Sequence, residues 1–508
     1  MTNKRAVFSV LITIFLLFTP AVQAREKSLL KEIYAREACT ILQSSDGEEI
    51  AGLARKGEAL LVLRPAFSFI SDTTNVRIYK VRTGKGIVGY VLPKYLTYDK
   101  EEAGRRYMAE KYDSLHRAAI DRFHGGNPLG CDFYPKEKPV FENNRMPQVC
   151  YSLYITASPA SLRKMDEYIA LAKTTCINTF VIDIKEDGVP GFKADAMKKY
   201  CPSAYASAGD NEELYRSVVE KIHAAGYWAV GRIVTFKDYH FTKDHPECAL
   251  WDKVNDEMLL HNKSHWPSAF CRKVWEYNAA LACEAVKKIG FNEINFDYVR
   301  FPDRLNSLEG SIDMRNRYGE SKIQAIQRFV AYAADQLHSH NAYISIDVFG
   351  ESANPGYTTP YGQYWPAISN VADVICGMPY PDHFSNGYYG INKPWNHPYE
   401  ILNAWGQRVQ DRQAETPSPA IVRTWIQSYH VLRCVDRNGI DYNAENMTKE
   451  IRGLYDAGLT GGYTTWLSSG SLESYRSKAD AFRIDYYKEW LSRKNTESEN
   501  EEKHITAP

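Results

Sequence analysis

Three aspartates lie inside apolar runs that are typical of buried β-strands. Asp183 lies in VIDIKEDG, Asp297 in EINFDYVRF and Asp347 in ISIDVFG. A carboxylate in such a place needs a polar cleft or a charged partner, because burying it alone is costly. Two carboxyl groups that meet in a cleft can cleave a glycosidic bond, one as proton donor and the other as nucleophile or base. The alternative is a purely structural role, in which Asp297 forms an ion pair with Arg300 at the end of the strand.

Strand-like and helix-like patterns alternate along the chain from residue 149 onward. The predicted strands are Val149–Ala157, Thr179–Lys185, Trp228–Phe236, Glu293–Arg300, Ala342–Phe349, Val371–Met378, Ile421–Gln427 and Gly462–Leu467. Helical periodicity is found at Ser161–Lys173, Glu212–Ala225, Arg272–Ile289, Ser321–Ser339 and Lys449–Ala457. Ser161 is the expected N-cap of the first helix, and Gly226 and Gly290 lie where C′ glycines belong. This alternation predicts an α/β fold, a (β/α)8 TIM barrel over residues 149–490.

The carboxyl ends of the strands are where such a barrel carries its reacting groups. A doubly wound open sheet is the rival fold, but no GxGxxG follows any early strand. The side chains that we expect to bind a substrate there are Asp183, Lys185, Arg232, Asn295, Arg300, Tyr380, Asp382, Trp425, Gln427 and Trp466. Tryptophans and tyrosines in the long loops add aromatic walls, which suit a carbohydrate cleft.

Five motifs resemble those of a bacterial family of glycosyl-hydrolase domain proteins. In chain order they are FVIDIKEDG, WAVGRIVTFKD, WPSAFCRKVWEYNAALACEAVKKIGFNEINFDYVRFPD, ISIDVFG and MPYPDHF, within Val149–Tyr487. The resemblance implies a barrel distantly similar to the alpha-amylase-like glycosidases, in a family whose activity is largely unassigned. The family often has Asp-Val-Lys-Asp-Asp where this chain has Ile-Asp-Ile-Lys-Glu-Asp, which leaves the roles of Glu186 and Asp187 open.

The amylase-like analogy also implies catalytic roles. A fourth-strand aspartate acts as the nucleophile in those barrels, which is Asp297 here. A fifth-strand carboxylic acid acts as acid/base, which is Asp347 or, as the second choice, Glu351. Arg232 and Arg300 would then hold sugar hydroxyls or keep Asp297 ionised.

A metal site has little support in the sequence. The histidines of the loop after the third strand are His240, His245, His261 and His265, and none forms an HxH or HExxH motif. Solvated loop histidines are the simpler interpretation, so we expect neither a metal nor another cofactor. A metal-dependent hydrolase that uses these histidines is retained as an alternative function. P-loop and GxSxG motifs are absent from the sequence.

The N-terminus has the pattern of a secretory signal peptide over residues 1–24. Lys4 and Arg5 precede the apolar run Ala6–Phe18, and Val22–Ala24 is a small-residue cleavage site. The run is short for a membrane span, so we expect a periplasmic or extracellular protein without a stable membrane anchor. Ten cysteines permit disulfides in that compartment, without showing how they pair.

A small all-β unit is predicted before the barrel, at residues 34–99. Its ending, GIVGYVLPKYL, resembles the last strand and turn of bacterial SH3-like domains, which implies a module that binds cell-wall material. A mere packing appendage is the alternative. A charged helix at Lys100–Phe123 and a linker complete residues 100–148, and residues 491–508 are predicted to be a flexible tail.

Charge and the strand-end residues together define the expected function. The 62 basic and 62 acidic residues cancel, and no basic block stands out, so nucleic acid is not an expected partner. We expect an exported glycoside hydrolase that cleaves a polysaccharide or cell-envelope glycan by a retaining mechanism. A non-catalytic protein that binds glycan or peptidoglycan is the alternative from another class.

Overall fold

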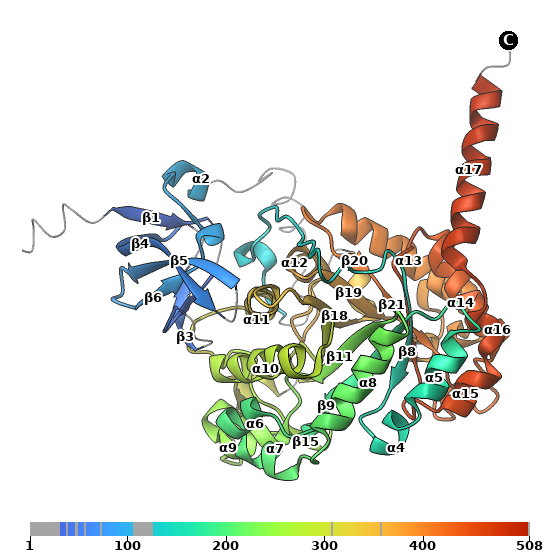
Figure 1. Cartoon of the computed structure of the whole chain (residues 1–508), viewed down its shortest axis with the longest axis horizontal. Helices are drawn as coiled ribbons and strands as arrows, with labels where there is room; N and C mark the ends of the chain where they lie inside the picture. The colour runs from blue at the N-terminus through green and yellow to red at the C-terminus, as the bar shows by residue number, and fades with distance from the viewer. Residues whose placement is uncertain are drawn as a thin grey trace, which may run out of the picture. The chain divides into compact units, whose positions relative to one another are not determined.

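The computed structural model describes residues 31–36, 39–45, 49–54, 57–71, 74–104, 125–305, 308–355 and 358–505. The predicted signal peptide and most of the predicted helix Lys100–Phe123 lie outside the described residues. The chain divides into two compact units, Met1–Arg105 and Arg106–Pro508. Figure 1 shows the first in blue, with the colours of the second running from cyan to red.

The first unit is a sheet of seven strands in the order β3-β2-β6-β5-β4-β1-β7, and its pairings are antiparallel. The strands are β1 (Glu32–Ala35), β2 (Cys39–Leu42), β3 (Ile50–Ala54), β4 (Ala59–Ser71), β5 (Thr74–Thr83), β6 (Val88–Val91) and β7 (Leu96–Thr97). Ile33, Ile41, Leu60 and Val81 are among the residues of its apolar core. The short helix α2 (Lys100–Gly104) follows. The prediction of a small all-β unit before the barrel is confirmed.

The second unit contains all eight predicted barrel strands. They are β8 (Cys150–Ile155), β9 (Thr179–Glu186), β11 (Trp228–Val234), β16 (Glu293–Asp297), β18 (Tyr343–Phe349), β19 (Val374–Met378), the split strand β20 (Ile421–Val422) and β21 (Thr424–Gln427), and β22 (Gly462–Trp466). Each pairs in parallel with its neighbours. Because β20 pairs with β19 and β21 pairs with β22, the split strand completes the (β/α)8 barrel.

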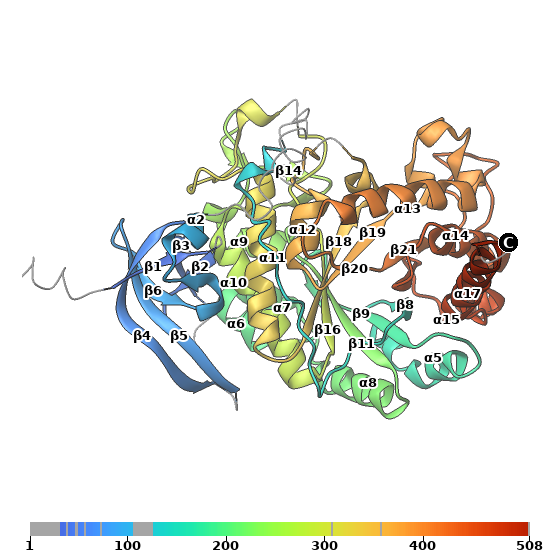
Figure 2. The ribbon, with the colours of Figure 1, turned by 90° about the horizontal axis from the view of Figure 1, so that it is seen from above.

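Helices follow the strands and lie around them (Figure 2). The larger ones are α5 (Met165–Ala172), α8 (Glu212–Ala224), α10 (Arg272–Glu284), α11 (Lys322–His338), α12 (Trp365–Val371), α13 (Pro398–Ala414), α14 (Ala444–Asp456) and α17 (Tyr486–Ile505). The shorter ones are α4 (Pro159–Leu162), α6 (Asp195–Tyr200), α7 (Pro202–Ser207), α9 (Tyr239–Asp244), α15 (Leu472–Ser477) and α16 (Ala479–Phe482). Among the helices that the structure describes, none combines the length and apolar character needed to cross a bilayer.

Several predicted boundaries are corrected by the structure. The helix expected to begin at Ser161 is two short helices, α4 and α5, and Ser158 precedes the first because Pro159 suits the N1 position. Gly226 follows α8, and Gly290 follows the π-helical turn Ala285–Ile289 that continues α10; both have positive φ, as predicted for residues that end helices. Helix α17 continues to Ile505, into the segment that was predicted to be a flexible tail.

The amino-terminal end of the barrel is closed by a buried ion pair and by the segment that precedes β8. Arg423 binds Glu293 at 2.8 Å, and both side chains are at most 2% exposed. Phe141 and Met146 from the preceding segment pack against the interior residues of the strands. Apolar packing at this end leaves the carboxyl ends of the strands as the polar mouth.

A long excursion between β11 and α10 lies beside that mouth. It carries the short strands β12 (Trp251–Asp252), β13 (Glu257–Met258), β14 (Leu260–His261) and β15 (Ser264–His265). Cys248 and Cys271, 23 residues apart, form a disulfide that closes the part of the excursion that carries these strands. Trp266 packs with Leu305 and with Tyr298, which immediately follows β16. The excursion therefore supports the end of the strand that carries Asp297.

Loss of this disulfide should destabilise the second unit. Replacing both Cys248 and Cys271 by alanine frees a loop whose closure is worth about 3 kcal/mol in the chain-entropy model. We expect the midpoint of denaturant unfolding of the full chain to fall accordingly. The control is Cys434→Ala, because Cys434 is exposed and unpaired. An unchanged midpoint in the double variant would contradict a stabilising role.

Candidate active site

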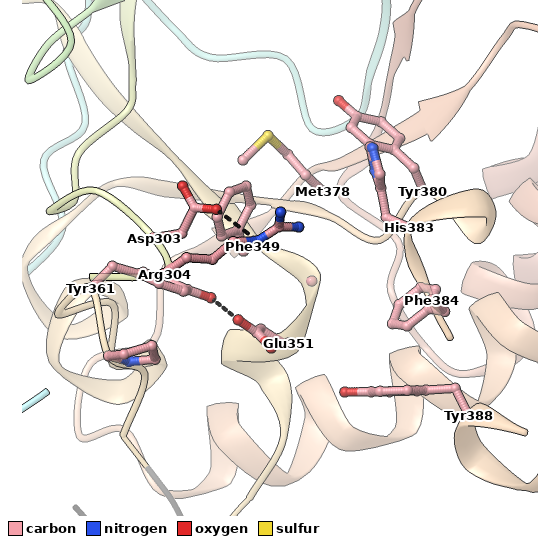
Figure 3. A pocket seen from close by; sticks show the side chains of 12 residues that line it. Asp303, Arg304, Phe349, Glu351, Tyr361, Met378, Tyr380, His383, Phe384 and Tyr388 are labelled. Atoms are coloured by element: carbon pink, nitrogen blue, oxygen red, sulfur yellow. Dashed lines mark hydrogen bonds and ion pairs between the residues drawn. The ribbon is translucent and has the colours of Figure 1, made fainter. Parts of the chain in front are cut away.

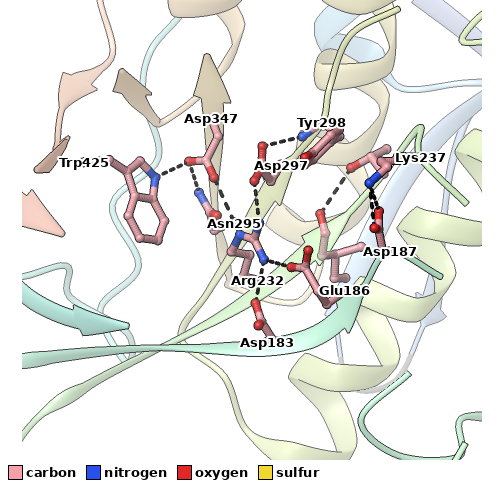
Figure 4. A network of polar contacts seen from close by, with 12 residues as sticks. Asp183, Glu186, Asp187, Arg232, Lys237, Asn295, Asp297, Tyr298, Asp347 and Trp425 are labelled. Carbon is pink, nitrogen blue, oxygen red and sulfur yellow. Dashed lines mark hydrogen bonds and ion pairs between the residues drawn. The ribbon is translucent and has the colours of Figure 1, made fainter. Parts of the chain in front are cut away.

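One arginine on β11, Arg232, stands at the centre of the polar cluster in the barrel (Figure 4). Its Nη1 donates to Oδ1 of Asp183 at 2.7 Å and also to Oε2 of Glu186. Its Nη2 donates to Oδ2 of Asp297 at 2.5 Å. The arginine side chain is only 2% exposed, so its charge has been taken out of water and must be matched by these carboxylates.

The register of the parallel strands brings these groups together. Arg232 is paired with Asp183 on β9 and with Asn295 on β16, while Asp297 is paired with Val234. Residues paired in register point to the same face of a sheet, and this face is the interior of the barrel. The polar cluster is thus fixed by the backbone of adjacent strands.

Aromatic rings cover the guanidinium of Arg232. The ring of Trp466 lies 5.6 Å and that of Tyr154 lies 5.8 Å from its central carbon, and the two rings are 4.8 Å apart. Tyr154 also donates a hydrogen bond to Asp183. Sequence reasoning missed Tyr154, although its strand offers a signal. In the CYSLYI run, Ser152 and Tyr154 lie two positions apart and so face the same side of the strand.

Lys185, predicted to bind substrate, is not part of the cluster. The pairing of β9 with β11 shifts after Arg232, so that Ile233 is opposite Lys185. The lysine ammonium instead binds Asp238 at 2.6 Å and Asn278 of helix α10 at 2.9 Å, and its side chain is fully buried. Because a β-bulge reverses the face that a residue presents, simple alternation along β9 gave the wrong side.

Asp297 is the last residue of β16, and the chain turns sharply after it. The strand was predicted to reach Arg300, but it ends earlier because Tyr298 adopts a left-handed backbone with φ of 53°. This conformation lets the backbone N–H of Tyr298 donate to Oδ1 of Asp297 at 2.5 Å. Strained non-glycine residues of this kind are common at functional sites. Each carboxyl oxygen of Asp297 therefore accepts a hydrogen bond, which fixes the orientation of the side chain.

Asp347 lies beside Asp297 on the neighbouring strand β18, fully buried. Its Oδ1 accepts hydrogen bonds from Asn295 and from the indole N–H of Trp425, both at 2.8 Å. Its Oδ2 has no hydrogen-bond partner and lies 4.0 Å from Nε of Arg232. Burial, together with the charge of Asp297, raises the pKa of Asp347 well above its usual range. Both effects favour the protonated form of Asp347, and Oδ2 is its oxygen without a partner.

The other two carboxylates of the cluster differ in burial. Asp183 is buried, and burial raises its pKa to about 6 despite the opposing effect of Arg232. The side chain of Glu186 is 42% exposed and faces the mouth. Glu186 therefore binds Arg232 from the solvent side, a role that the sequence had left open.

A cavity of about 530 Å³ opens between the loops that follow β16, β18 and β19 (Figure 3). The residues that line it are Asp303, Arg304, Phe349, Gly350, Glu351, Pro360, Tyr361, Met378, Tyr380, His383, Phe384 and Tyr388. Glu351 accepts a hydrogen bond from the hydroxyl of Tyr361 there. The structure thus places Glu351 in this cavity, among aromatic rings, whereas Asp297 and Asp347 lie in the Arg232 cluster.

Three further residues predicted to bind substrate are held by other protein groups. Asp382 is buried, and it accepts hydrogen bonds from the Tyr429 hydroxyl and from the backbone N–H of Leu432. Gln427 accepts from the backbone N–H of Asp382. Arg300 is buried and donates to the backbone oxygen of Phe301. These contacts fix the loops around the mouth.

The candidate metal-binding histidines are dispersed. His245 bonds to the carbonyl of Tyr200, and His265 to that of Leu259. Among the residues that the structure describes, no group of three or more histidine, cysteine, aspartate or glutamate side chains is arranged to hold a metal ion.

The sequence matches the model of one protein family over residues 152–471, more than half of the chain. That family is described as "Putative glycosyl hydrolase domain", and the chain belongs to it. No curated protein sequence matches the chain.

Solved structures that resemble the chain include three bacterial proteins. A hypothetical protein from Ruminiclostridium thermocellum is 30% identical over 39% of this chain and 97% of its own, with a TM-score of 0.33. The glycoside hydrolase domain of PgaB (BpsB) from Bordetella bronchiseptica is 11% identical over 66% and 99%, with a TM-score of 0.47. The chitobiase of Flavobacterium johnsoniae is 10% identical over 68% and 50%, with a TM-score of 0.43.

Removing the central cation should expose the mutual repulsion of the carboxylates. In Arg232→Met the buried carboxylates lose their counter-charge, which typically costs about 3–5 kcal/mol. We expect this loss in denaturant unfolding at pH 8 and a smaller loss at pH 5, because protonation neutralises the unpaired acids. Arg476→Met is the control, since Arg476 pairs with Glu167 on the surface. A loss that is equal at both pH values would contradict this account.

Proposed function

We propose that this protein is an exported glycoside hydrolase that cleaves a polysaccharide or cell-envelope glycan by a retaining mechanism. The observation that carries the proposal is the pair of adjacent aspartates with opposite environments. Asp297 accepts hydrogen bonds from Arg232 and from a backbone N–H, whereas burial and the charge of Asp297 raise the pKa of Asp347 and favour its protonated form. Carboxyl groups whose environments drive them to different protonation states divide the roles of nucleophile and acid.

In the proposed reaction, Asp297 attacks the anomeric carbon and Asp347 supplies the proton to the leaving oxygen. The free Oδ2 of Asp347 would supply this proton. Water then attacks the glycosyl–Asp297 ester and gives a proton back to Asp347, and Asp297 is released as a carboxylate. Arg232 balances the charge of Asp297 before the attack and that of the carboxylates left afterwards. Trp466, whose ring covers Arg232, would face the sugar from the mouth.

A non-catalytic envelope protein that binds glycan is the second candidate. The full burial of Asp347 favours it, because an acid must come within hydrogen-bonding distance of the leaving oxygen. Such a protein would bind oligosaccharides without releasing products from them.

Export is supported by the disulfide between Cys248 and Cys271, because structural disulfides persist in oxidising compartments. We further propose that the first unit, through its SH3-like ending, holds the enzyme on cell-wall material. A pull-down of the full chain with purified peptidoglycan sacculi tests this part on its own.

Asp297→Asn should abolish glycan cleavage while the protein remains folded. The amide keeps the shape of the carboxylate but cannot form the glycosyl intermediate. We expect at least about a 10³-fold loss of reducing-end release from a panel of polysaccharides, with the circular dichroism spectrum unchanged. Asp166→Asn is the control, because Asp166 is exposed and pairs with Lys221 on the surface. Products from the wild type with full activity in Asp297→Asn would contradict the assignment; no products from either favours the binding protein.

The dependence of activity on pH should report the protonation of Asp347. Activity is expected to fall as pH rises through the raised pKa of Asp347, since only the protonated form can donate. In Asp347→Asn this alkaline limb should disappear, and activity should survive best on aryl glycosides with acidic phenol leaving groups. Glu186→Gln serves as the comparison, because Glu186 is the exposed acid of the cluster. If Glu186→Gln shows the leaving-group dependence instead, the proton comes from Glu186.

Asp347→Asn should not cost stability. A carboxyl whose pKa is raised by folding stabilises the protein only at acidic pH, and that contribution is lost as pH rises through the folded value. An amide removes this dependence and can still accept the two hydrogen bonds at its oxygen. We therefore expect the variant to be as stable as the wild type at pH 7, or more stable, by thermal unfolding. A marked loss of stability would show that Asp347 is ionised.

A further inference from the structure

The cavity that contains Glu351 lies outside the two-aspartate chemistry and is built like a ligand site. Its volume of about 530 Å³ lies in the usual range of about 300–1,000 Å³ for small-molecule pockets. We propose that it holds an uncharged pyranose unit of the glycan, next to the unit that is cleaved, and that Glu351 selects this unit by hydrogen bonding to its hydroxyls. This inference rests on the proposed glycoside hydrolase function.

The cavity is joined to the Arg232 cluster by aromatic rings. Tyr380 lines the cavity, and its ring is stacked near that of Trp466, with centroids 6.4 Å apart and planes at 25°. Trp466 in turn covers the guanidinium of Arg232. A glycan that binds over Trp466 at the cluster can therefore extend past Tyr380 into the cavity.

The walls of the cavity suit the faces of a sugar ring. Phe349 and Tyr361 meet edge to face with centroids 5.1 Å apart, and Phe384 and Tyr388 lie 4.9 Å apart. Aromatic rings present large apolar faces, and the C–H face of a pyranose is apolar as well. Figure 3 shows these side chains around the cavity, with the carboxyl group of Glu351 directed at the hydroxyl of Tyr361.

Glu351 is the carboxylate of this cavity that is available to a ligand. Its Oε1 accepts from the Tyr361 hydroxyl, while no described residue donates to Oε2. Asp303, the other acid of the wall, is engaged by Arg300 at 3.4 Å and by Arg304 at 3.6 Å. A fixed carboxylate with a free oxygen accepts well from sugar hydroxyls.

The charge of the cavity disfavours acidic sugars. Glu351 would repel a uronic acid or a phosphate, and the guanidinium in the lining, that of Arg304, is already paired with Asp303 at 3.6 Å. His383 does not compensate, since burial lowers its pKa and keeps the ring neutral at pH 7. The site therefore fits uncharged hexoses or N-acetylhexosamines.

The test uses the full chain with Asp297→Asn and four defined tetrasaccharides as probes: cellotetraose, maltotetraose, chitotetraose and tetragalacturonate. Calorimetric titration is expected to show binding of at least one uncharged probe. Adding Glu351→Gln should weaken that binding about tenfold or more, the value of one hydrogen bond to a charged group. Adding Glu247→Gln should change nothing, because Glu247 pairs with Lys273 outside the cavity. Tighter binding of tetragalacturonate than of every uncharged probe would overturn the proposal.

Steady-state kinetics of variants that keep Asp297 distinguish this inference from the proposed function. Glu351→Gln is expected to raise KM about tenfold or more with kcat nearly unchanged. A large loss of kcat that acidic leaving groups restore would make Glu351 the acid/base and overturn the selecting role. Unchanged KM and kcat on a glycan that the wild type cleaves would also overturn it, while leaving the glycoside hydrolase intact. If the wild type neither binds nor cleaves any glycan, both proposals fail.

Discussion

A single buried cation, the guanidinium of Arg232, determines how the mouth of this barrel is arranged. Three carboxylates bind it directly, and the pKa of a fourth carboxyl group, Asp347, is raised by burial and by the nearby charge of Asp297. Removing an arginine from water is expensive, so the cluster is stable only when its partners are oriented by the strands. The strands hold Arg232 and its carboxylate partners in place, and this fixed charge gives Asp297 and Asp347 different electrostatic surroundings.

Much of this arrangement follows from the sequence, because strand period and strand order are local patterns. Asp183, Asp297 and Asp347 each stand inside an apolar run, and in a closed parallel barrel such residues must converge at one end. The eight predicted strands all exist. Arg232, Asn295 and Trp425 do bind the aspartates, and Trp466 covers Arg232. The polar residues of the barrel interior can therefore be predicted from the sequence wherever side chains alternate regularly along a strand.

The residues that sequence reasoning misplaced are those governed by backbone irregularity or by distant partners. A shift in pairing turns Lys185 toward helix α10, and the left-handed backbone of Tyr298 ends β16 three residues early. Glu351 lies beyond its strand in a short helical turn, so no period predicts whether it faces the aspartates or the neighbouring cavity. The partners of Asp382 come from a loop about fifty residues later in the chain. The positions of these side chains depend on tertiary contacts, which secondary-structure propensities do not predict.

The segment that closes the amino-terminal end has a consequence for where the folding unit begins. Phe141 and Met146 fill the apolar end of the barrel, and Lys138 donates to the backbone carbonyls of Ser369, Asn370 and Ala372 that end helix α12. The family match starts only at residue 152. A chain cut at that boundary would leave the barrel floor open to water and these carbonyls unsatisfied. The smallest autonomous unit is therefore longer than the family domain, because it includes at least the segment from Lys138 onward.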